Sequence, residues 1–182
     1  MTSLRSSPRA PARASLRHVA KVLVTGMSGT GKSSVLRVLA DRGHRVVDTD
    51  TEEWSEWVDD GWNWRENAID TLLDGHEQGH LFLAGCHTNQ GRFYDRLDGI
   101  VLLSAPADVL LERIETRPDN PYGKSDEERA LVVHHVATVE PLLRRTATHV
   151  IDATAPVPTI VEQLEAIAET SGSQRTRIAR GS

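Results

Sequence analysis

Residues 26–33 carry the clearest chemical signal in the chain. They fit the pattern G-x-x-x-x-G-K-[ST], in which a curled backbone points its N–H groups at phosphate oxygens. In that pattern the lysine reaches the β- and γ-phosphates and the final hydroxyl binds Mg²⁺. An apolar run at 20–25 comes before the segment and a helical pattern at 33–42 follows it, so strand, loop and helix stand in the required order. The predicted nucleotide-binding residues are Gly26, Met27, Ser28, Gly29, Thr30, Gly31, Lys32, Ser33 and Ser34.

Two carboxylates separated by one residue, Asp48 and Asp50, end the next predicted strand, residues 44–48. The carboxyl ends of strands in an open α/β sheet are where ligands bind. One carboxylate can then order the water shell of the metal while the other accepts a proton from a substrate hydroxyl. We therefore expect Asp48, with Ser33, at a Mg²⁺ site and Asp50 in catalysis and substrate binding. The alternative is a solvated acidic turn with an aspartate as helix cap.

All four tryptophans of the chain fall between residues 54 and 64, although the chain has only eight aromatic residues. This segment is either a flap that lines an acceptor pocket, with Arg65 supplying a cation, or a small apolar cluster that pins a helical excursion to the body. The residue types leave both readings open. A helix is predicted from Trp64 to Gln78, with its apolar residues on one side.

A third buried strand, 80–84, runs into a loop of small and polar residues that starts at Gly85. Glycine at a strand end allows close approach of a ligand, so Gly85 is a candidate substrate contact, although the same composition also suits an ordinary loop. Cys86 has no neighbour in sequence that clearly lowers its pKa, which favours a structural role. His87, one histidine in a loop, is weak as a predictor of function.

Arg113 and Arg117 lie four residues apart on one face of a helix predicted from Pro106 to about Thr116. A turn-rich loop at 118–124 follows, and Ser125 with Glu128 forms a capping box for a helix that reaches about Arg145. The pattern favours a mobile lid whose arginines neutralise charge on a transferring phosphoryl group, with Arg117 catalytic and Arg113 at the nucleotide. The alternative is a surface helix end held by salt bridges.

Alternating strand and helix patterns predict a three-layer α/β/α P-loop NTPase fold with a central parallel sheet of about five strands. The last two strands are expected at 100–104 and 148–152, and Pro158 opens a final amphipathic helix. We divide the chain into a flexible basic tail (1–18), one kinase-like domain (19–170) and a flexible polar tail (171–182). The basic tail is either a disordered segment, an organellar transit peptide or a basic arm.

The bulk properties narrow the partners. The 182 residues carry a net charge of −5, which implies no general affinity for nucleic acid. No apolar run approaches the roughly 20 residues that span a bilayer, so we expect no membrane partner. A single cysteine excludes an internal disulfide and agrees with a cytoplasmic location. The chain is expected as a monomer or homodimer.

The order of these motifs, from about Lys21 to Ala168, resembles the small-molecule and nucleoside monophosphate kinases of the P-loop class, with shikimate kinase nearest in layout. Asp48-Thr49-Asp50 is similar to that family's Asp-x-Asp motif, Trp64-Arg65 to its aromatic-arginine pair in the acceptor site, and Arg113 and Arg117 to its lid arginines. The resemblance implies ATP and Mg²⁺ as cofactors and a small-molecule acceptor.

Two departures concern the acceptor half. Glu140-Pro141-Leu142-Leu143 is similar to the end of the family's Arg-x-Pro-Leu-Tyr motif, but the arginine would fall at Val139. The family's triple glycine is Ala84-Gly85-Cys86 here. We therefore expect transfer of the ATP γ-phosphate to a small-molecule hydroxyl. The alternatives are a nucleoside monophosphate kinase, with Arg65 and Arg92 or Arg96 holding the acceptor phosphate, and a non-catalytic ATP-binding regulatory module.

Overall fold

A computed structural model describes residues 19–59, 61–118 and 120–180, with only the backbone described from residue 173 on. The predicted basic tail, residues 1–18, lies outside the described residues. The central element is a five-stranded sheet in the order β2-β5-β1-β6-β7. Every neighbouring pair in it is parallel. Its strands are β1 (Lys21–Thr25), β2 (Arg45–Asp48), β5 (Leu81–Ala84), β6 (Gly99–Ser104) and β7 (His149–Asp152).

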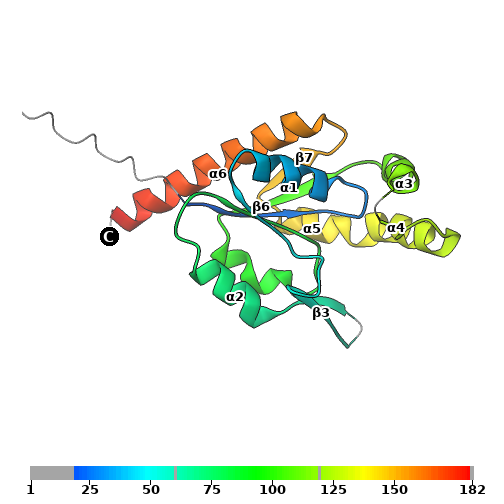
Figure 1. Cartoon of the computed structure of the whole chain (residues 1–182), viewed down its shortest axis with the longest axis horizontal. Helices are drawn as coiled ribbons and strands as arrows, with labels where there is room; N and C mark the ends of the chain where they lie inside the picture. Colours follow the sequence, from blue (N-terminus) through cyan, green and yellow to red (C-terminus); the bar gives the residue numbers. More distant parts are fainter. Residues whose placement is uncertain (1–18, 60, 119, 181–182) are drawn as a thin grey trace, which may run out of the picture.

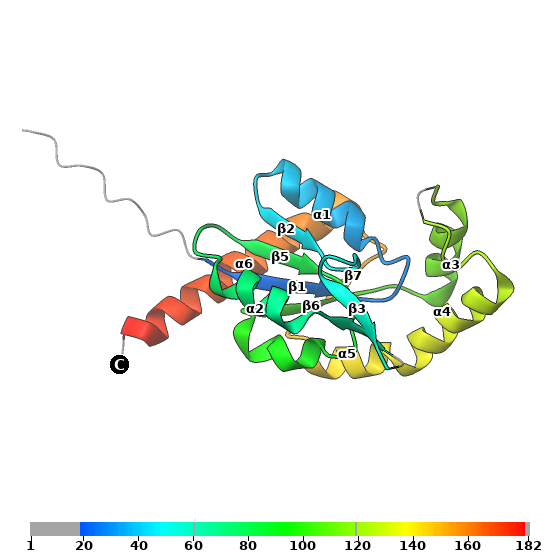
Figure 2. The same ribbon diagram turned by 60° about the horizontal axis from the view of Figure 1, so that its bottom comes forward.

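The sheet is covered by helices on both faces (Figure 1). The helices α1 (Lys32–Asp41) and α6 (Val157–Arg180) lie on one face, and α2 (Glu66–Asp74), the 3₁₀ helix η1 (Gln90–Arg96) and α5 (Glu140–Thr146) lie on the other. Near the carboxyl ends of the strands, α3 (Ala107–Thr116) and α4 (Asp126–Thr138) project from the body (Figure 2). The predicted three-layer α/β/α fold is confirmed.

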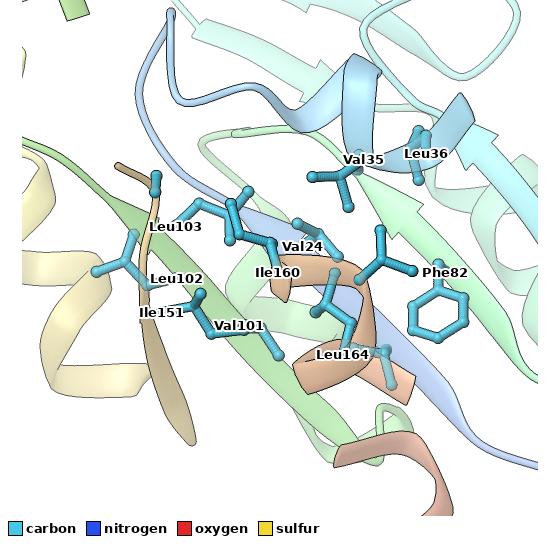
Figure 3. Packing of buried hydrophobic residues seen from close by; sticks show 14 of the residues in the cluster. Val24, Val35, Leu36, Phe82, Val101, Leu102, Leu103, Ile151, Ile160 and Leu164 are labelled. Carbon is cyan, nitrogen blue, oxygen red and sulfur yellow. The ribbon is translucent and has the colours of Figure 1, made fainter. Parts of the chain in front are cut away.

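The two faces of the sheet bury different apolar clusters because successive side chains on a strand point to opposite sides. Figure 3 shows Val24, Phe82 and Val101 of the sheet packed with Val35 of α1 and Leu164 of α6. The second cluster joins Leu23, Leu81 and Leu83 to α2 and η1. Strands that are buried on both faces need nearly continuous apolar runs, which is why all four residues of β5 are buried.

The tryptophan segment is a β-hairpin, so the second of the two alternatives, a helical excursion, is wrong. Its strands are β3 (Ser55–Val58) and β4 (Gly61–Trp64), and they pair antiparallel with each other and not with the main sheet. Apolar and polar side chains alternate in the segment, and aromatic side chains suit a pleated, half-buried surface. The hairpin ends where α2 begins, and α2 stops at Asp74 before Gly75, short of the predicted Gln78.

The helix predicted from residue 125 to 145 is two helices. The capping box of Ser125 and Glu128 starts α4 as expected. The helix ends near Val139, and Pro141 stands in the first turn of α5, where proline is tolerated because the first N–H groups of a helix have no partner. At the other end of the chain, α6 continues to Arg180, past residue 170, where the sequence placed the end of the domain.

The order of the strands decides where a ligand can bind. From β1 the chain builds β2 and β5 on one side, then crosses β1 and adds β6 and β7 on the other side. The loop after the central strand therefore lies where the connections diverge, which is the usual ligand crevice of open α/β sheets. The β3–β4 hairpin and α3–α4 also stand at this end of the sheet (Figures 1 and 2).

Candidate active site

The glycine-rich loop follows β1 as predicted, and its shape depends on the glycines. Gly26, Gly29 and Gly31 all have positive φ, of 149°, 87° and 92°. A Cβ atom at Gly26 would lie 2.4 Å from the carbonyl oxygen of Leu103, and one at Gly29 would lie 2.8 Å from that of Leu110. Only glycine allows the loop to lie this close to β6 and α3. These contacts support the predicted phosphate-binding backbone.

The start of α1 is open for an anion. Gly31 is the N-cap of the helix and has no side chain, so it leaves the first backbone N–H groups without a capping hydrogen bond. Lys32 donates from Nζ to the carbonyl oxygens of Gly26 at 2.7 Å and Met27 at 3.4 Å. Its ammonium group therefore lies across the loop where phosphate oxygens would bind. Thr30, which is buried, fixes the loop through a 2.8 Å hydrogen bond to Met27.

The two predicted metal ligands come together from different elements. The Ser33 hydroxyl at the start of α1 donates to Oδ2 of Asp48 at the end of β2, at 3.4 Å. Both groups present hard oxygen ligands of the kind that Mg²⁺ takes, usually one or two from the protein with phosphates and water for the rest. The described residues include no group of three or more His, Cys, Asp or Glu side chains arranged around a metal, so a cage made of protein alone is absent there.

Asp50 lies two residues beyond β2, and its backbone N–H donates to Oδ1 of Asp48 at 3.1 Å. Its side chain is 48% exposed, so one part is open to a ligand. Burial of the remainder raises the pKa of Asp50, which Lys32 and the Cys86 N–H oppose and Asp48 reinforces. A raised pKa brings a carboxylate closer to the value of an effective general base at neutral pH. For Cys86, burial raises the pKa of the thiol, in agreement with a structural role.

His87, for which the sequence provides only weak evidence of function, lies beside Asp50. Its side chain is fully buried, and Nε2 lies 3.5 Å from Oδ1 of Asp50 and 2.8 Å from the hydroxyl of Ser55. That hydroxyl donates to the Thr49 carbonyl at 2.6 Å, so His87 supplies the Nε2 proton. Burial, followed by the charge of Lys32, lowers the pKa of His87 to about 4, so the ring is neutral at pH 7. Only long-range pairing of the β5 loop with the hairpin reveals this contact.

The hairpin is attached to the loop after β5 through its backbone. Asn89 accepts from the Trp64 N–H at 2.8 Å and donates to the Trp64 carbonyl at 3.0 Å, while the Thr88 N–H donates to Trp62 at 3.2 Å. The ring of His87 lies between Trp62 and Trp64, with centroid distances of 6.4 and 5.4 Å. The carboxylate end of β2, the loop after β5 and the hairpin therefore form one packed unit.

Three predicted substrate residues lie in positions that the sequence did not show. Trp64 is 2% exposed and packs edge-on against Phe93, so it belongs to the core under the hairpin. Arg65 pairs with Glu56 at 3.0 Å and donates to the Glu52 carbonyl, so its cation is already bound. The space beside the Cα of Gly85 is filled, because a Cβ atom there would lie 2.2 Å from Oγ1 of Thr49, so a ligand atom does not fit at that position.

The two arginines predicted for a lid contact different loops of the body. Arg117 donates to the Ser28 hydroxyl of the phosphate loop at 3.3 Å and to the Tyr122 carbonyl at 2.6 Å. Arg113, one turn earlier, donates to the Ala153 carbonyl after β7 at 2.9 Å. The structure thus brings Arg117 next to the phosphate loop and holds Arg113 by the loop after β7.

Comparison with known proteins agrees with this arrangement. A family model described as AAA domain matches residues 22–134. Shikimate kinase 2 of Yersinia enterocolitica is 30% identical over 167 residues, which cover 79% of this chain and 92% of that protein. The chain belongs to the shikimate-kinase-like P-loop kinases.

Solved structures of two kinases share the fold. Shikimate kinase from Acinetobacter baumannii, in complex with shikimate, has a TM-score of 0.60 at 16% identity, covering 82% of this chain and 92% of that one. A gluconokinase from Sinorhizobium meliloti has a TM-score of 0.53 at 18% identity, covering 90% and 97%. In the part of the chain that the structure describes, every helix is too short or too polar to cross a bilayer.

Proposed function

We propose that this protein is an ATP-dependent kinase that transfers the γ-phosphate of ATP to a hydroxyl group of a small molecule. The observation that carries the proposal is the arrangement at the end of β2. Asp48 reaches the Ser33 hydroxyl of the phosphate loop, and Asp50, next to it, is half-exposed. In the proposed site, a carboxylate that can accept a hydroxyl proton would lie beside the residues that would hold Mg²⁺ and triphosphate.

On the donor side, the loop backbone and the start of α1 would bind the β- and γ-phosphates, and Lys32 would leave the Gly26 carbonyl to contact the γ-phosphate. Arg117, already at Ser28, would neutralise charge that develops on the transferring group. Ser33 and Asp48 would hold Mg²⁺, which neutralises charge on the β- and γ-oxygens.

On the acceptor side, Asp50 would orient the hydroxyl and take its proton as the oxygen bonds to the γ-phosphorus. The bond from that phosphorus to the β–γ bridging oxygen breaks, ADP leaves with the electron pair, and the proton passes from Asp50 to solvent. His87 would hold the Asp50 carboxylate, and the hairpin would exclude water from the reacting groups.

The arginines proposed for a nucleoside monophosphate acceptor do not converge. Arg92 pairs with Glu66, and Arg96 pairs with Asp70 and with Asp74, all on α2. Arg65 pairs with Glu56 on the hairpin. An acceptor phosphate needs at least two converging cations, so this arrangement favours a different acceptor. A cytoplasmic location and a monomeric or homodimeric state remain predictions.

The test is ADP production with Mg²⁺ and ATP against a panel of nucleoside monophosphates, nucleosides, sugars, sugar acids, shikimate and amino alcohols. We expect one class of acceptor to raise turnover well above the basal rate, and Lys32→Ala and Asp50→Asn to abolish that increase. Tight ATP binding with no response to any acceptor would contradict the proposal and favour the regulatory module.

A further inference from the structure

The hairpin has two unlike faces. Side chains alternate along a strand, and the register pairs Ser55 with Trp64 and Trp57 with Trp62, so these four share one face, which we call the aromatic face. Its base packs on His87, which contacts Asp50. Farther out, the rings of Trp57 and Trp62 lie 5.5 Å apart, and Trp57 is 72% exposed. The exposed end of the aromatic face is therefore connected to the candidate catalytic carboxylate through the buried ring of His87.

The cation of the hairpin is on the opposite face. Glu56 lies between Ser55 and Trp57, so it points away from the aromatic face, and Arg65 forms its ion pair there. On α5, Arg144 is bound to Glu140 and Ser104. The position where the resemblance calls for an arginine is the apolar Val139. Arg92 and Arg96 of η1 pair with carboxylates of α2. Each of these described arginines is therefore already paired with a carboxylate.

The charge of the same stretch is strongly negative. Residues 48–66 hold eight acidic residues and one basic residue, Arg65. The neutral His87 ring adds no positive charge beside Asp50. An anionic acceptor would be repelled by these carboxylates, and the arginines of the protein that could attract it are already paired. A cationic acceptor would be attracted by both the carboxylates and the aromatic rings.

We propose that the acceptor of this kinase is a hydroxyl compound that carries a protonated amine, such as an amino sugar or amino alcohol, with its cation against Trp57 and Trp62. The inference rests on the proposed kinase function and adds the class of the substrate. The hydroxyl lies at Asp50, and the ammonium group lies over the aromatic face, where each ring attracts the cation through its negative π surface.

The first test is a binding measurement that needs no turnover. All four tryptophans lie between residues 54 and 64, so intrinsic fluorescence reports this site directly. The matched probes are glucosamine, glucose and gluconate, then 2-aminoethanol, ethylene glycol and glycolate, each with Mg²⁺ and a non-hydrolysable ATP analogue. We expect at least one amine to bind about tenfold more tightly than its matched acid and to weaken as salt is raised. Equal or tighter binding of the acids, or no saturable change with either amine, would overturn the proposal.

Variants tie the preference to the two faces. Trp57→Leu, at an exposed position that does not threaten folding, should weaken amine binding about tenfold in calorimetry and leave the affinity for the ATP analogue unchanged. Glu56→Gln should free the Arg65 cation from its ion pair. The ratio of the affinity for the amine to the affinity for the matched acid should then fall. Glu162→Gln, which removes the same charge from an exposed position on α6, is the control. Amine binding that Trp57→Leu leaves intact would contradict the assigned face.

Product analysis separates the two proposals. Phosphorylation of a sugar or sugar acid, but of no amine, would reject the amine and retain the kinase. Amine binding at the aromatic face with no phosphoryl transfer to any acceptor would support the ligand class and reject the kinase.

Discussion

At the scale of residues, the two carboxylates at the end of β2 occupy different surroundings. Asp48 accepts a hydrogen bond from the Ser33 hydroxyl. Asp50 contacts buried His87, and about half of its side chain is exposed to solvent. The contacts separate a metal-ordering role from a proton-accepting role. Replacing each aspartate with asparagine should therefore change a different kinetic property of the protein.

Asp50→Asn should lower kcat by about 100-fold or more with ATP affinity unchanged, because the general base is lost and the phosphate loop is not. Asp48→Asn should instead raise the Mg²⁺ concentration needed for half-maximal rate by about tenfold. Steady-state kinetics with Mg²⁺ and acceptor varied in turn would separate the two. Identical behaviour of the two variants would contradict the division of roles.

Gly85 makes a second residue-scale prediction. In Gly85→Ala the new methyl would meet Oγ1 of Thr49 at 2.2 Å and Cε1 of His87 at 2.5 Å, so we expect a loss of about 1–3 kcal/mol in the free energy of unfolding. Gly91→Ala is the control, because nothing lies within 4 Å of its Cβ position. Urea denaturation of both variants measures the two free energies of unfolding. Equal values would show that the side chains around Thr49 rearrange at no cost and would contradict the prediction.

The phosphate loop was predictable because its chemistry is local. Consecutive residues supply the backbone curl, Lys32 and Ser33, so one stretch of sequence contains the whole motif. His87 was not predictable, because its partners are Ser55, on a hairpin far away in sequence, and Asp50, after another strand. Arg65 was predicted as a cation beside the tryptophans, but its pairing with Glu56 depends on the register of two antiparallel strands.

At the scale of elements, the hairpin and the loop after β5 are held together by His87. A buried histidine with a pKa of about 4, against an ordinary 6.5, binds its proton less tightly in the folded protein than in the unfolded chain. The stability that it contributes is complete above pH about 6.5 and is lost as the pH falls toward 4.

We therefore expect the parent protein to lose about 2 kcal/mol more in the free energy of unfolding than His87→Gln between pH 7 and pH 5. Chemical denaturation at the two pH values measures the difference, and other titrating groups cancel in the comparison. A parallel loss in both proteins would show that His87 is solvated and that the hairpin is not packed on it.

The elements themselves were predictable to different degrees. The five strands of the main sheet are short apolar runs between polar turns, and each lies where the sequence placed it. The hairpin was harder, because an aromatic cluster suits a helix face or a strand face equally until the partner of each strand is known. The break between α4 and α5 was not predicted, although Pro141 lies inside the single helix that was expected and proline in mid-helix removes a backbone donor.

At the scale of the whole molecule, the candidate active site lies at the carboxyl ends of the strands, and an open cavity of about 1000 Å³ lies at the opposite end, where β2 and β5 begin. There, Glu165 of α6 binds Arg42 at 2.6 Å and His44 at 2.9 Å and ties the final helix to the end of α1. Burial raises the pKa of Glu165, but the hydrogen bonds from His44 and Arg42 outweigh that effect and lower it.

Glu165→Gln should reduce the free energy of unfolding by about 1 kcal/mol, a modest amount because the ion pairs are partly exposed. Kinase activity at saturating ATP should stay at the parent level, since the phosphate loop and Asp50 are at the carboxyl ends of the strands and the ion pairs are at the opposite end. Thermal unfolding with a parallel activity assay would test both statements. A loss of activity without a loss of stability would reveal coupling between the two ends of the sheet.

The central claim is phosphoryl transfer to a hydroxyl, and ³¹P NMR of the complete reaction tests it most directly. Protein, Mg²⁺ and ATP are incubated with the acceptor that binds most tightly in the fluorescence titration. We predict a phosphate ester signal that grows in equal amount with ADP and is absent with Lys32→Ala and Asp50→Asn. Formation of ADP with inorganic phosphate alone, or no consumption of ATP, would contradict the account.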